Sequence, residues 1–149
     1  GMCADAYFLG DRDLSRSESL VKAAKTAYAM AGISSPQKEI DIAEVYDAFS
    51  YQELMWLEGL GLCTDGEAGM MLEKGEFDIP GRLPVNPSGG LLGGHAVIAA
   101  GLYRIAEVVR QVRGEAGKYQ VKKADIGLAH GVNGLAGQSH CVWILGKDR

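Results

Sequence analysis

The sequence of 149 residues has few of the features that mark membrane, exported or nucleic-acid-binding proteins. No apolar run approaches the roughly 18 to 20 residues that a membrane-spanning helix needs, and no charged and then apolar N-terminus indicates an export signal. Its fifteen lysine and arginine residues are dispersed and the formal net charge is −4, so no surface for nucleic acid or anionic lipid is expected. We expect a cytoplasmic protein with one compact domain over residues 1–149.

Cysteine is scarce, and the spacing of Cys3, Cys63 and Cys141 forms no CxxC pair. Three widely spaced cysteines argue against a disulfide framework and a structural zinc site, so we expect reduced thiols and no metal. The sequence also has no Walker loop, GxSxG elbow, HExxH helix, or GxGxxG turn after a strand. These absences exclude the usual phosphate, serine-hydrolase, zincin and dinucleotide sites, and no bound cofactor is expected.

Hydrophobic periodicity and turn residues predict an α/β domain with a mixed sheet. The helix expected at residues 16–31 has a capping box, Ser15 with Glu18, at its start and Gly32 at its end. Residues 62–94 show no sustained period and are expected to form a long ordered loop with one helical turn. The other expected elements are strands at 3–9, 40–46, 126–130 and 140–145, and helices at 50–59 and 95–113.

The most informative segment is the end of this loop, where four glycines and His95 stand directly before the helix expected at residues 95–113. A histidine at a helix N-terminus faces the partial positive charge of free backbone N–H groups, which favours the neutral imidazole. Such an imidazole can donate a hydrogen bond to a carbonyl or enolate oxygen, or act as a base. The spacing alone fits equally well a surface loop whose histidine merely caps the helix.

Two further segments place chemistry-bearing residues at strand ends. Tyr46 and Asp47 end the strand expected at 40–46, and ligands usually bind at such carboxyl ends in α/β sheets. Tyr46 can donate a phenolic proton to an oxyanion and Asp47 can orient the loop, although an edge tyrosine beside a capping aspartate is the simpler interpretation. His130 and Gly131 precede an Asn-Gly turn, which either brings backbone N–H groups to a ligand carbonyl or closes an ordinary hairpin.

In order and spacing, these segments resemble the C-terminal domain of thiolases. The resemblance is strongest to the branch of sterol-carrier-protein-type (lipid-transfer-protein) thiolases and archaeal acetyl-CoA acetyltransferases, and it covers the chain from about Ser17 to Leu145. Its most specific matches are Ala31-Gly32-Ile33, Glu44-Val45 through Phe49-Ser50, Leu60-Gly61-Leu62-Cys63 with Gly66, Asn86-Pro87-Ser88-Gly89-Gly90 with Gly94-His95, and Gln111 through Gly117.

The resemblance implies half of the thiolase core, a layered five-stranded mixed sheet with helices packed on its faces. It also implies acyl-CoA chemistry, in which a carbon–carbon bond is made or broken next to a thioester, with the coenzyme A thioester as substrate. His95 would help to activate the nucleophile and hold the thioester oxygen, and Tyr46 would position a water or a substrate oxygen. The substrate-binding residues that the resemblance implies are Asn86, Gly94, Asp47, His130 and Gly131.

The sequence also departs from the thiolase pattern. The nucleophilic cysteine of thiolases belongs to an N-terminal half that this sequence does not contain. Thiolases carry their acid/base cysteine in one of two places. The first corresponds to Tyr46-Asp47-Ala48-Phe49 and the second falls near Gly131, and neither has a cysteine here. The proline that usually follows the histidine is replaced by Ala96. A thiolytic cycle needs a thiolate nucleophile and a proton shuttle, so we expect the chain to be inactive alone.

A tyrosine at the strand-end position is similar instead to thiolase-like aldolases, which cleave CoA-ester side chains and work with a small OB-fold, zinc-ribbon partner. We therefore expect the C-terminal domain or subunit of a thiolase-like acyl-CoA acyltransferase. A thiolase-like aldolase subunit and a non-catalytic acyl-CoA-binding or lipid-binding module are the alternatives. The partner would be a thiolase N-terminal half or a second copy in a homodimer, because half a thiolase core leaves an apolar face uncovered.

Overall fold

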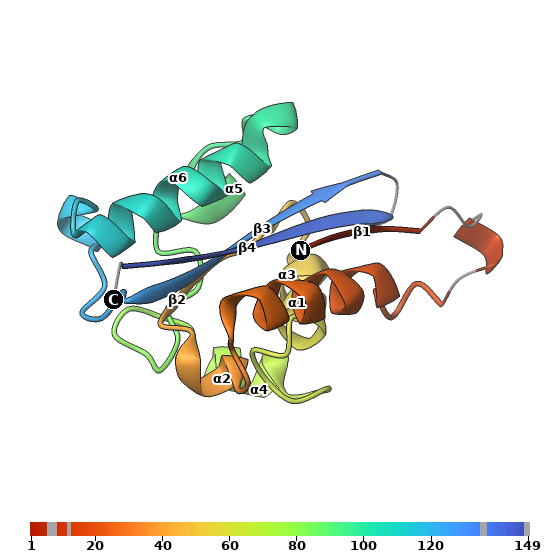
Figure 1. Cartoon of the computed structure of the whole chain (residues 1–149), viewed down its shortest axis with the longest axis horizontal. Coiled ribbons are helices and arrows are strands. Elements are labelled where there is room, and N and C mark those ends of the chain that lie inside the picture. Colours follow the sequence, from red (N-terminus) through yellow and green to blue (C-terminus); the bar gives the residue numbers. More distant parts are fainter. Residues whose placement is uncertain (6–8, 12, 135–136, 148–149) are drawn as a thin grey trace.

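The computed structural model describes residues 1–5, 9–11, 13–134 and 137–147. Within these residues, a mixed sheet of four strands runs in the order β1-β4-β3-β2 (Figure 1). β4 pairs antiparallel with both β1 and β3, whereas β2 pairs with β3 in parallel. The strands are β1 (Met2–Ala4), β2 (Ile42–Glu44), β3 (Ile126–Asn133) and β4 (Ser139–Gly146).

Helices cover both faces of this sheet, which confirms the predicted α/β class (Figure 1). On one face, α1 (Glu18–Ala31) packs against β1 and β4, and α3 (Ser50–Gly59) packs in turn against α1. On the other face, α6 (Ala100–Arg113) packs against β3. The remaining elements are short: η1 (Leu9–Asp11), α2 (Pro36–Glu39), α4 (Ala68–Glu73), α5 (Gly90–Gly93), η2 (Val97–Ala99) and η3 (Gly117–Tyr119). Among the described residues, no helix is long and apolar enough to cross a membrane.

The described sheet has four strands, so the predicted count of five was wrong. A single parallel bridge between Ala43 and Val85 extends the sheet beyond β2. Ala43 N donates to Pro84 O at 3.1 Å, and Asn86 N donates to Ala43 O at 2.8 Å. Pro84 has no N–H to donate, and Asn86 leaves the extended region with a φ of 48°. The pairing therefore stops at one bridge and no fifth strand forms.

The N-terminal elements are shorter than predicted. The strand expected at residues 3–9 is reduced to β1 among the described residues, and its residues 6–8 lie outside them. The N-cap of α1 is Ser17 and not Ser15: the Ser17 Oγ accepts a hydrogen bond from a backbone N–H of the first turn at 3.4 Å. Gly32, with a φ of 69°, ends α1 as predicted.

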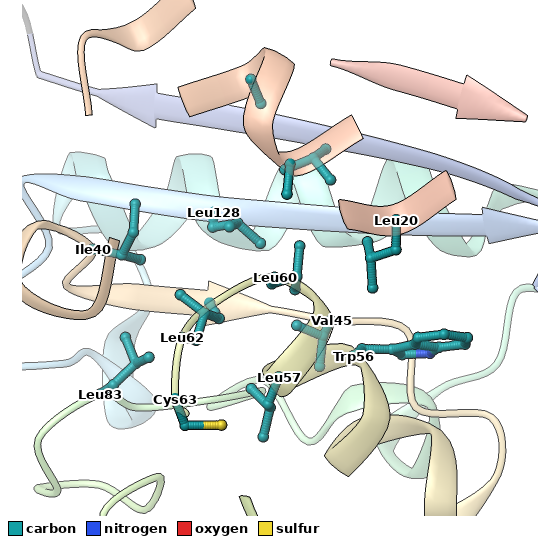
Figure 2. Packing of buried hydrophobic residues seen from close by; sticks show 14 of the residues in the cluster. Leu20, Ile40, Val45, Trp56, Leu57, Leu60, Leu62, Cys63, Leu83 and Leu128 are labelled. Atoms are coloured by element: carbon teal, nitrogen blue, oxygen red, sulfur yellow. The ribbon is translucent and has the colours of Figure 1, made fainter. Parts of the chain in front are cut away.

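The main hydrophobic core lies between the sheet and the helices α1 and α3 (Figure 2). Leu57, Leu62 and Leu128 are fully buried in it. Val45, directly after β2, is also fully buried in this core, so the chain emerges from it only at Tyr46. The core therefore fixes the strand end that carries the predicted site residues. A second, smaller cluster of Val108, Val112 and Ala129 joins α6 to the other face of the sheet.

Candidate functional site

The candidate site lies where the end of β2 meets residues 86–95, which we call the histidine loop. Side chains, and no regular sheet ladder, join the two segments. Three of them accept hydrogen bonds across the junction: Asn86 Oδ1 from Val45 N at 2.8 Å, Glu44 from Ser88 N and Oγ at 3.1 and 2.8 Å, and Asp47 Oδ1 from Leu91 N at 2.8 Å. The histidine loop is thus fixed to the strand end from its first residue to its middle.

A buried ion pair lies beneath the histidine loop. Arg104 of α6 donates from Nη1 to Glu44 Oε2 at 3.0 Å, and the two side chains are 3% and 0% exposed. Arg104 Nη2 also donates to Gly90 O at 3.5 Å, so β2, α6 and the histidine loop meet at this pair. Burial raises the pKa of Glu44 to about 7, whereas Arg104 and the hydrogen bonds from Ser88 act in the opposite direction.

The two residues predicted to be catalytic face each other. The ring centroids of Tyr46 and His95 are 6.4 Å apart, and the ring planes meet at 74°, an edge-to-face contact. Tyr46 is half-buried and His95 is exposed. An imidazole and a phenol on one wall can exchange a proton or a hydrogen bond with a ligand oxygen. His95 also lines an open groove of about 450 Å³, together with Ser88, Gly90, Gly93, Gly94, Ala96, Tyr103, Arg104 and Glu107.

His95 does not stand at the start of a regular helix, and this part of the prediction was wrong. α6 begins only at Ala100, after Gly94 in an extended conformation and the 3₁₀ turn η2. Val97 has a φ of 47°, which is rare for a β-branched residue and turns the chain between the histidine and the helix. The argument that a helix N-terminus keeps the imidazole neutral therefore does not apply to His95.

The residues predicted to contact substrate occupy different depths. Gly94 lines the groove, and a Cβ built on it would meet nothing within 4 Å. The Nδ2 of Asn86 is buried and has no hydrogen-bond partner within the described residues, so it is an available donor. His130 is fully buried, and its Nδ1 accepts a hydrogen bond from Tyr46 N at 3.5 Å. Gly131 lies at a close approach of β3 to α6, where an added Cβ would be 3.3 Å from Gly101 Cα.

Glu44, Ser88 and Arg104 were not predicted from the sequence as site residues. Glu44 and Arg104 are 60 positions apart in the chain, so only the fold brings them together. The apolar periodicity of residues 97–112 predicts a wide apolar face that includes Leu102 and Ala106, but both side chains are exposed in the structure. Arg104 lies four positions from the buried Ala100 and four from the buried Val108. This helical spacing is the one sequence feature that places Arg104 on the buried face of α6. The residues that α6 buries are Ala100, Arg104, Val108, Gln111 and Val112.

No thiol belongs to the candidate site in the described part of the chain. Cys63 is buried in the core, and burial raises the pKa of its thiol to about 11, which disfavours the reactive thiolate. Cys3 and Cys141 lie on β1 and β4, are partly buried, and do not line the groove. The described residues also hold no cluster of three or more His, Cys, Asp or Glu side chains that could bind a metal.

Gly90 supports a prediction about the shape of the histidine loop. Gly90 has a φ of 58°, and a Cβ on it would collide with the Asp47 carboxylate. Gly89 also has a positive φ, 94°, but its Cβ would make an ordinary contact, 3.5 Å from the nearest atom. We expect Gly89→Ala to cost about 1 kcal/mol of backbone strain and Gly90→Ala about 2 to 3 kcal/mol, measured by urea denaturation. Equal losses would mean that the Asp47 contact does not hold the loop.

His130 supports a prediction about pH. Burial lowers the pKa of His130 well below its usual value, so the folded chain keeps this imidazole neutral where the unfolded chain protonates it. Stability should therefore fall as the pH decreases below about 6.5, by at most about 1.4 kcal/mol per pH unit. In His130→Gln this contribution is absent, so the stability advantage of the wild type should shrink between about pH 7 and pH 5. A difference that stays constant over that range would contradict the prediction.

Comparisons with known proteins relate this chain to thiolases. A family model described as thiolase C-terminal domain-like matches residues 2–147. The acetyl-CoA acetyltransferase of Methanothermobacter thermautotrophicus is 45% identical over 127 residues, which cover 85% of this chain and 33% of that protein. Sterol carrier protein 2 of Rattus norvegicus is 41% identical over 117 residues, covering 78% of this chain and 21% of that protein. The chain spans a third or less of the length of these two relatives.

A solved structure matches the whole chain. The Ltp2-ChsH2(DUF35) aldolase superposes with a TM-score of 0.80 at 29% sequence identity, and the match covers 100% of this chain and 38% of that one. The fold therefore occurs as one part of a longer polypeptide in a protein of known structure.

Proposed function

This chain belongs to the thiolase C-terminal domain-like family, and we propose that it forms one wall of the acyl-CoA site of a thiolase-like acyltransferase. Such an enzyme makes or breaks a carbon–carbon bond next to a thioester. The observation that carries the proposal is the contact between Tyr46 and His95 beside an open groove, on a loop fixed by buried hydrogen bonds. The similarity to an acetyl-CoA acetyltransferase supports this substrate class.

Each site residue has a distinct part in the proposed reaction. His95 is exposed in the groove, where it would take the proton from a nucleophilic thiol that another domain or subunit supplies. The Tyr46 hydroxyl would donate a hydrogen bond to the oxygen that becomes negative when the thioester carbonyl is attacked. The free Nδ2 of Asn86 is a second donor near the same strand end. Because the described site holds no thiol, the chain is proposed to be inactive alone.

A second candidate function is aldol cleavage of a β-hydroxyacyl-CoA ester. The observation in its favour is that a tyrosine faces His95 and that no thiol lies beside them among the described residues. In this reaction a base removes the hydroxyl proton, the bond between the α- and β-carbons breaks, and the thioester enolate takes up a proton. Tyr46 and His95 can share these two proton transfers without a thiolate. The match to an aldolase structure over the whole chain also supports it.

One reconstitution experiment separates these functions. The chain is mixed with a candidate thiolase N-terminal half from the same genome, and complex formation, thioester thiolysis and aldol cleavage are measured on the same sample. Thiolysis by the complex, and none by either part alone, is the result expected from the main proposal. Aldol cleavage alone would establish the second candidate. A stable complex that catalyses neither reaction would contradict both and leave a non-catalytic acyl-CoA- or lipid-binding module.

The surface beside the site indicates where such a partner binds. Large apolar side chains lie exposed on the histidine loop, on η2 and at the start of α6, and we call them the apolar rim. Exposed apolar clusters of this kind usually mark an interface. We propose that a thiolase N-terminal half covers the rim, with self-association as the other outcome of the test. The apolar rim consists of Ile98 (100% exposed), Leu92 (97%), Leu102 (68%), Val97 (67%) and Tyr103 (52%).

The apolar rim supports a prediction about association. Leu102→Glu should weaken binding of the partner half at least about tenfold, because a charge would be buried at the interface. Met30→Glu is the matched control, since Met30 is 80% exposed on α1, which covers the opposite face of the sheet from α6. Binding is measured by calorimetry, and self-association of each variant by light scattering. Equal affinities of the two variants would exclude the rim as the interface.

A further inference from the structure

A chain of hydrogen bonds runs from the candidate site to the turn of the β3–β4 hairpin. Tyr46 N donates to His130 Nδ1 at 3.5 Å, and His130 Nε2 lies 2.9 Å from His140 Nδ1. His140 Nε2 lies 2.8 Å from Gly137 O and 2.9 Å from the Oγ of Ser17, the N-cap of α1. Both imidazoles are fully buried. We call the path from Tyr46 N through both imidazoles to Gly137 O the histidine relay.

Only one arrangement of protons is consistent with this path. A backbone N–H can only donate, so His130 Nδ1 must be the acceptor and the proton of His130 must lie on Nε2. That proton then points at His140 Nδ1, which places the proton of His140 on its own Nε2. A carbonyl can only accept, and Gly137 O is correctly placed to receive it. Each link thus fixes the next, and both rings are neutral.

Packing holds both rings in the orientation that the relay needs. The two imidazoles lie nearly in one plane, with centroids 5.2 Å apart and planes at 11°, as the hydrogen bond between them requires. The Trp56 ring meets both of them edge-on, at 5.7 Å from His130 and 4.9 Å from His140. Gly137 leaves room for this arrangement, because a Cβ on it would lie 2.8 Å from the Trp56 ring. The relay therefore ends on a backbone carbonyl and not on solvent.

We infer that His130 and His140 are positioning residues that act through the backbone of Tyr46. They hold the end of β2 in the orientation that turns the Tyr46 phenol towards His95. Neither imidazole is accessible to a ligand, so their part in catalysis is indirect. The structural inference stands on the hydrogen bonds alone, and only its catalytic consequence rests on the proposed function. The 3.5 Å link to Tyr46 is the longest in the relay, so the test addresses that link directly.

Nuclear magnetic resonance of this chain tests the inference without any assay of activity. Correlation of the imidazole nitrogens with the ring protons should show both buried histidines as neutral tautomers protonated on Nε2. Nuclear Overhauser contacts should join the rings of Tyr46 and His95. A wild-type His130 protonated on Nδ1, or on both nitrogens at neutral pH, would overturn the inference. Absence of enzymatic activity in a reconstituted complex would leave this result unaffected.

Two variants of His140 and one control separate positioning from packing. His140→Leu removes the acceptor for His130, so the Tyr46 amide should exchange at least about tenfold faster and the contact between Tyr46 and His95 should be lost. His140→Asn keeps an oxygen near the former Nδ1 that can accept the hydrogen bond from His130. Compared with His140→Leu, it should slow the exchange of the Tyr46 amide and restore part of the contact between Tyr46 and His95. Trp56→Phe should lower stability but change neither the tautomers nor the ring contact.

Two outcomes of the variant series would overturn the inference. One is a folded His140→Leu chain with an unchanged Tyr46 amide and an unchanged ring contact with His95. The other is that Trp56→Phe disturbs Tyr46 as much as His140→Leu does, which would show that packing alone positions the tyrosine. If His140→Leu does not fold, the wild-type tautomers and the comparison of His140→Asn with Trp56→Phe decide between positioning and packing.

Discussion

Glu44→Gln is expected to lower the free energy of unfolding by about 3 to 5 kcal/mol, the range observed when one member of a buried ion pair is removed. The substitution keeps the shape of the side chain but removes the one carboxylate that, among the described residues, is bonded to the Arg104 guanidinium. Arg104 is only 3% exposed, so water can replace little of the lost carboxylate contact. Its Nε already has no partner within the described residues, so the protein has no spare acceptor for the charge.

The reverse substitution should cost less. In Arg104→Met the remaining group is Glu44, whose pKa burial raises to about 7 even beside the arginine. Without the arginine that pKa rises further, so near neutral pH the carboxyl can take up a proton and become uncharged. The arginine cannot lose its charge in the same way. The cost of Arg104→Met should therefore grow as the pH rises, because the carboxyl must then ionise without a partner.

Urea denaturation of the two single variants and the double variant at several pH values measures this asymmetry. The double variant Glu44→Gln with Arg104→Met should recover most of the loss, because a neutral pair of similar volume leaves no buried charge. Losses that simply add in the double variant would show that the two residues do not act as a pair. Equal losses in the two single variants would contradict the proposed protonation of Glu44.

The parts of the site that follow each other in the chain could be predicted from the sequence. Tyr46 and Asp47 follow closely after β2, and the glycines before His95 mark a loop, so both segments were found from local signals. The pairing of Glu44 with Arg104 could not be found in this way, because it depends on where α6 lies on the sheet. The same holds for His140, because alternation along a strand predicts that some positions face the core and others the surface, but not what His140 contacts.

α6 shows why its orientation could not be predicted. Periodicity analysis assumes that the apolar stripe of a helix faces the core. Here the helix buries Arg104 and Gln111 and exposes Leu102. We propose that a partner covers the apolar residues that α6 leaves exposed, such as Leu102. The start of α6 was misplaced for a related reason: the positive φ of Val97 is set by the surrounding loop, and no local sequence rule predicts it for valine.

Tyr46→Phe is expected to lower kcat of the reconstituted complex by about 10²- to 10⁴-fold, the usual range for loss of a positioned proton donor. The change removes one hydroxyl and leaves the edge-to-face contact with the His95 ring, so the stability and the affinity for the partner half should stay close to those of the wild type. Tyr51→Phe is the matched control, because Tyr51 is 58% exposed on α3 and stacks on Phe49. Its kcat should be unchanged.

The size and pattern of this loss also distinguish the two candidate reactions. In thiolysis, His95 and a thiol from the partner carry the proton transfers, so Tyr46→Phe should reduce the rate and His95→Gln should reduce it more. In aldol cleavage the phenol itself moves a proton, so Tyr46→Phe should abolish turnover. Combining it with His95→Gln should then add little, because residues that act as one unit are not additive. Unchanged aldol turnover in Tyr46→Phe would exclude the tyrosine from catalysis and, with it, the aldolase candidate.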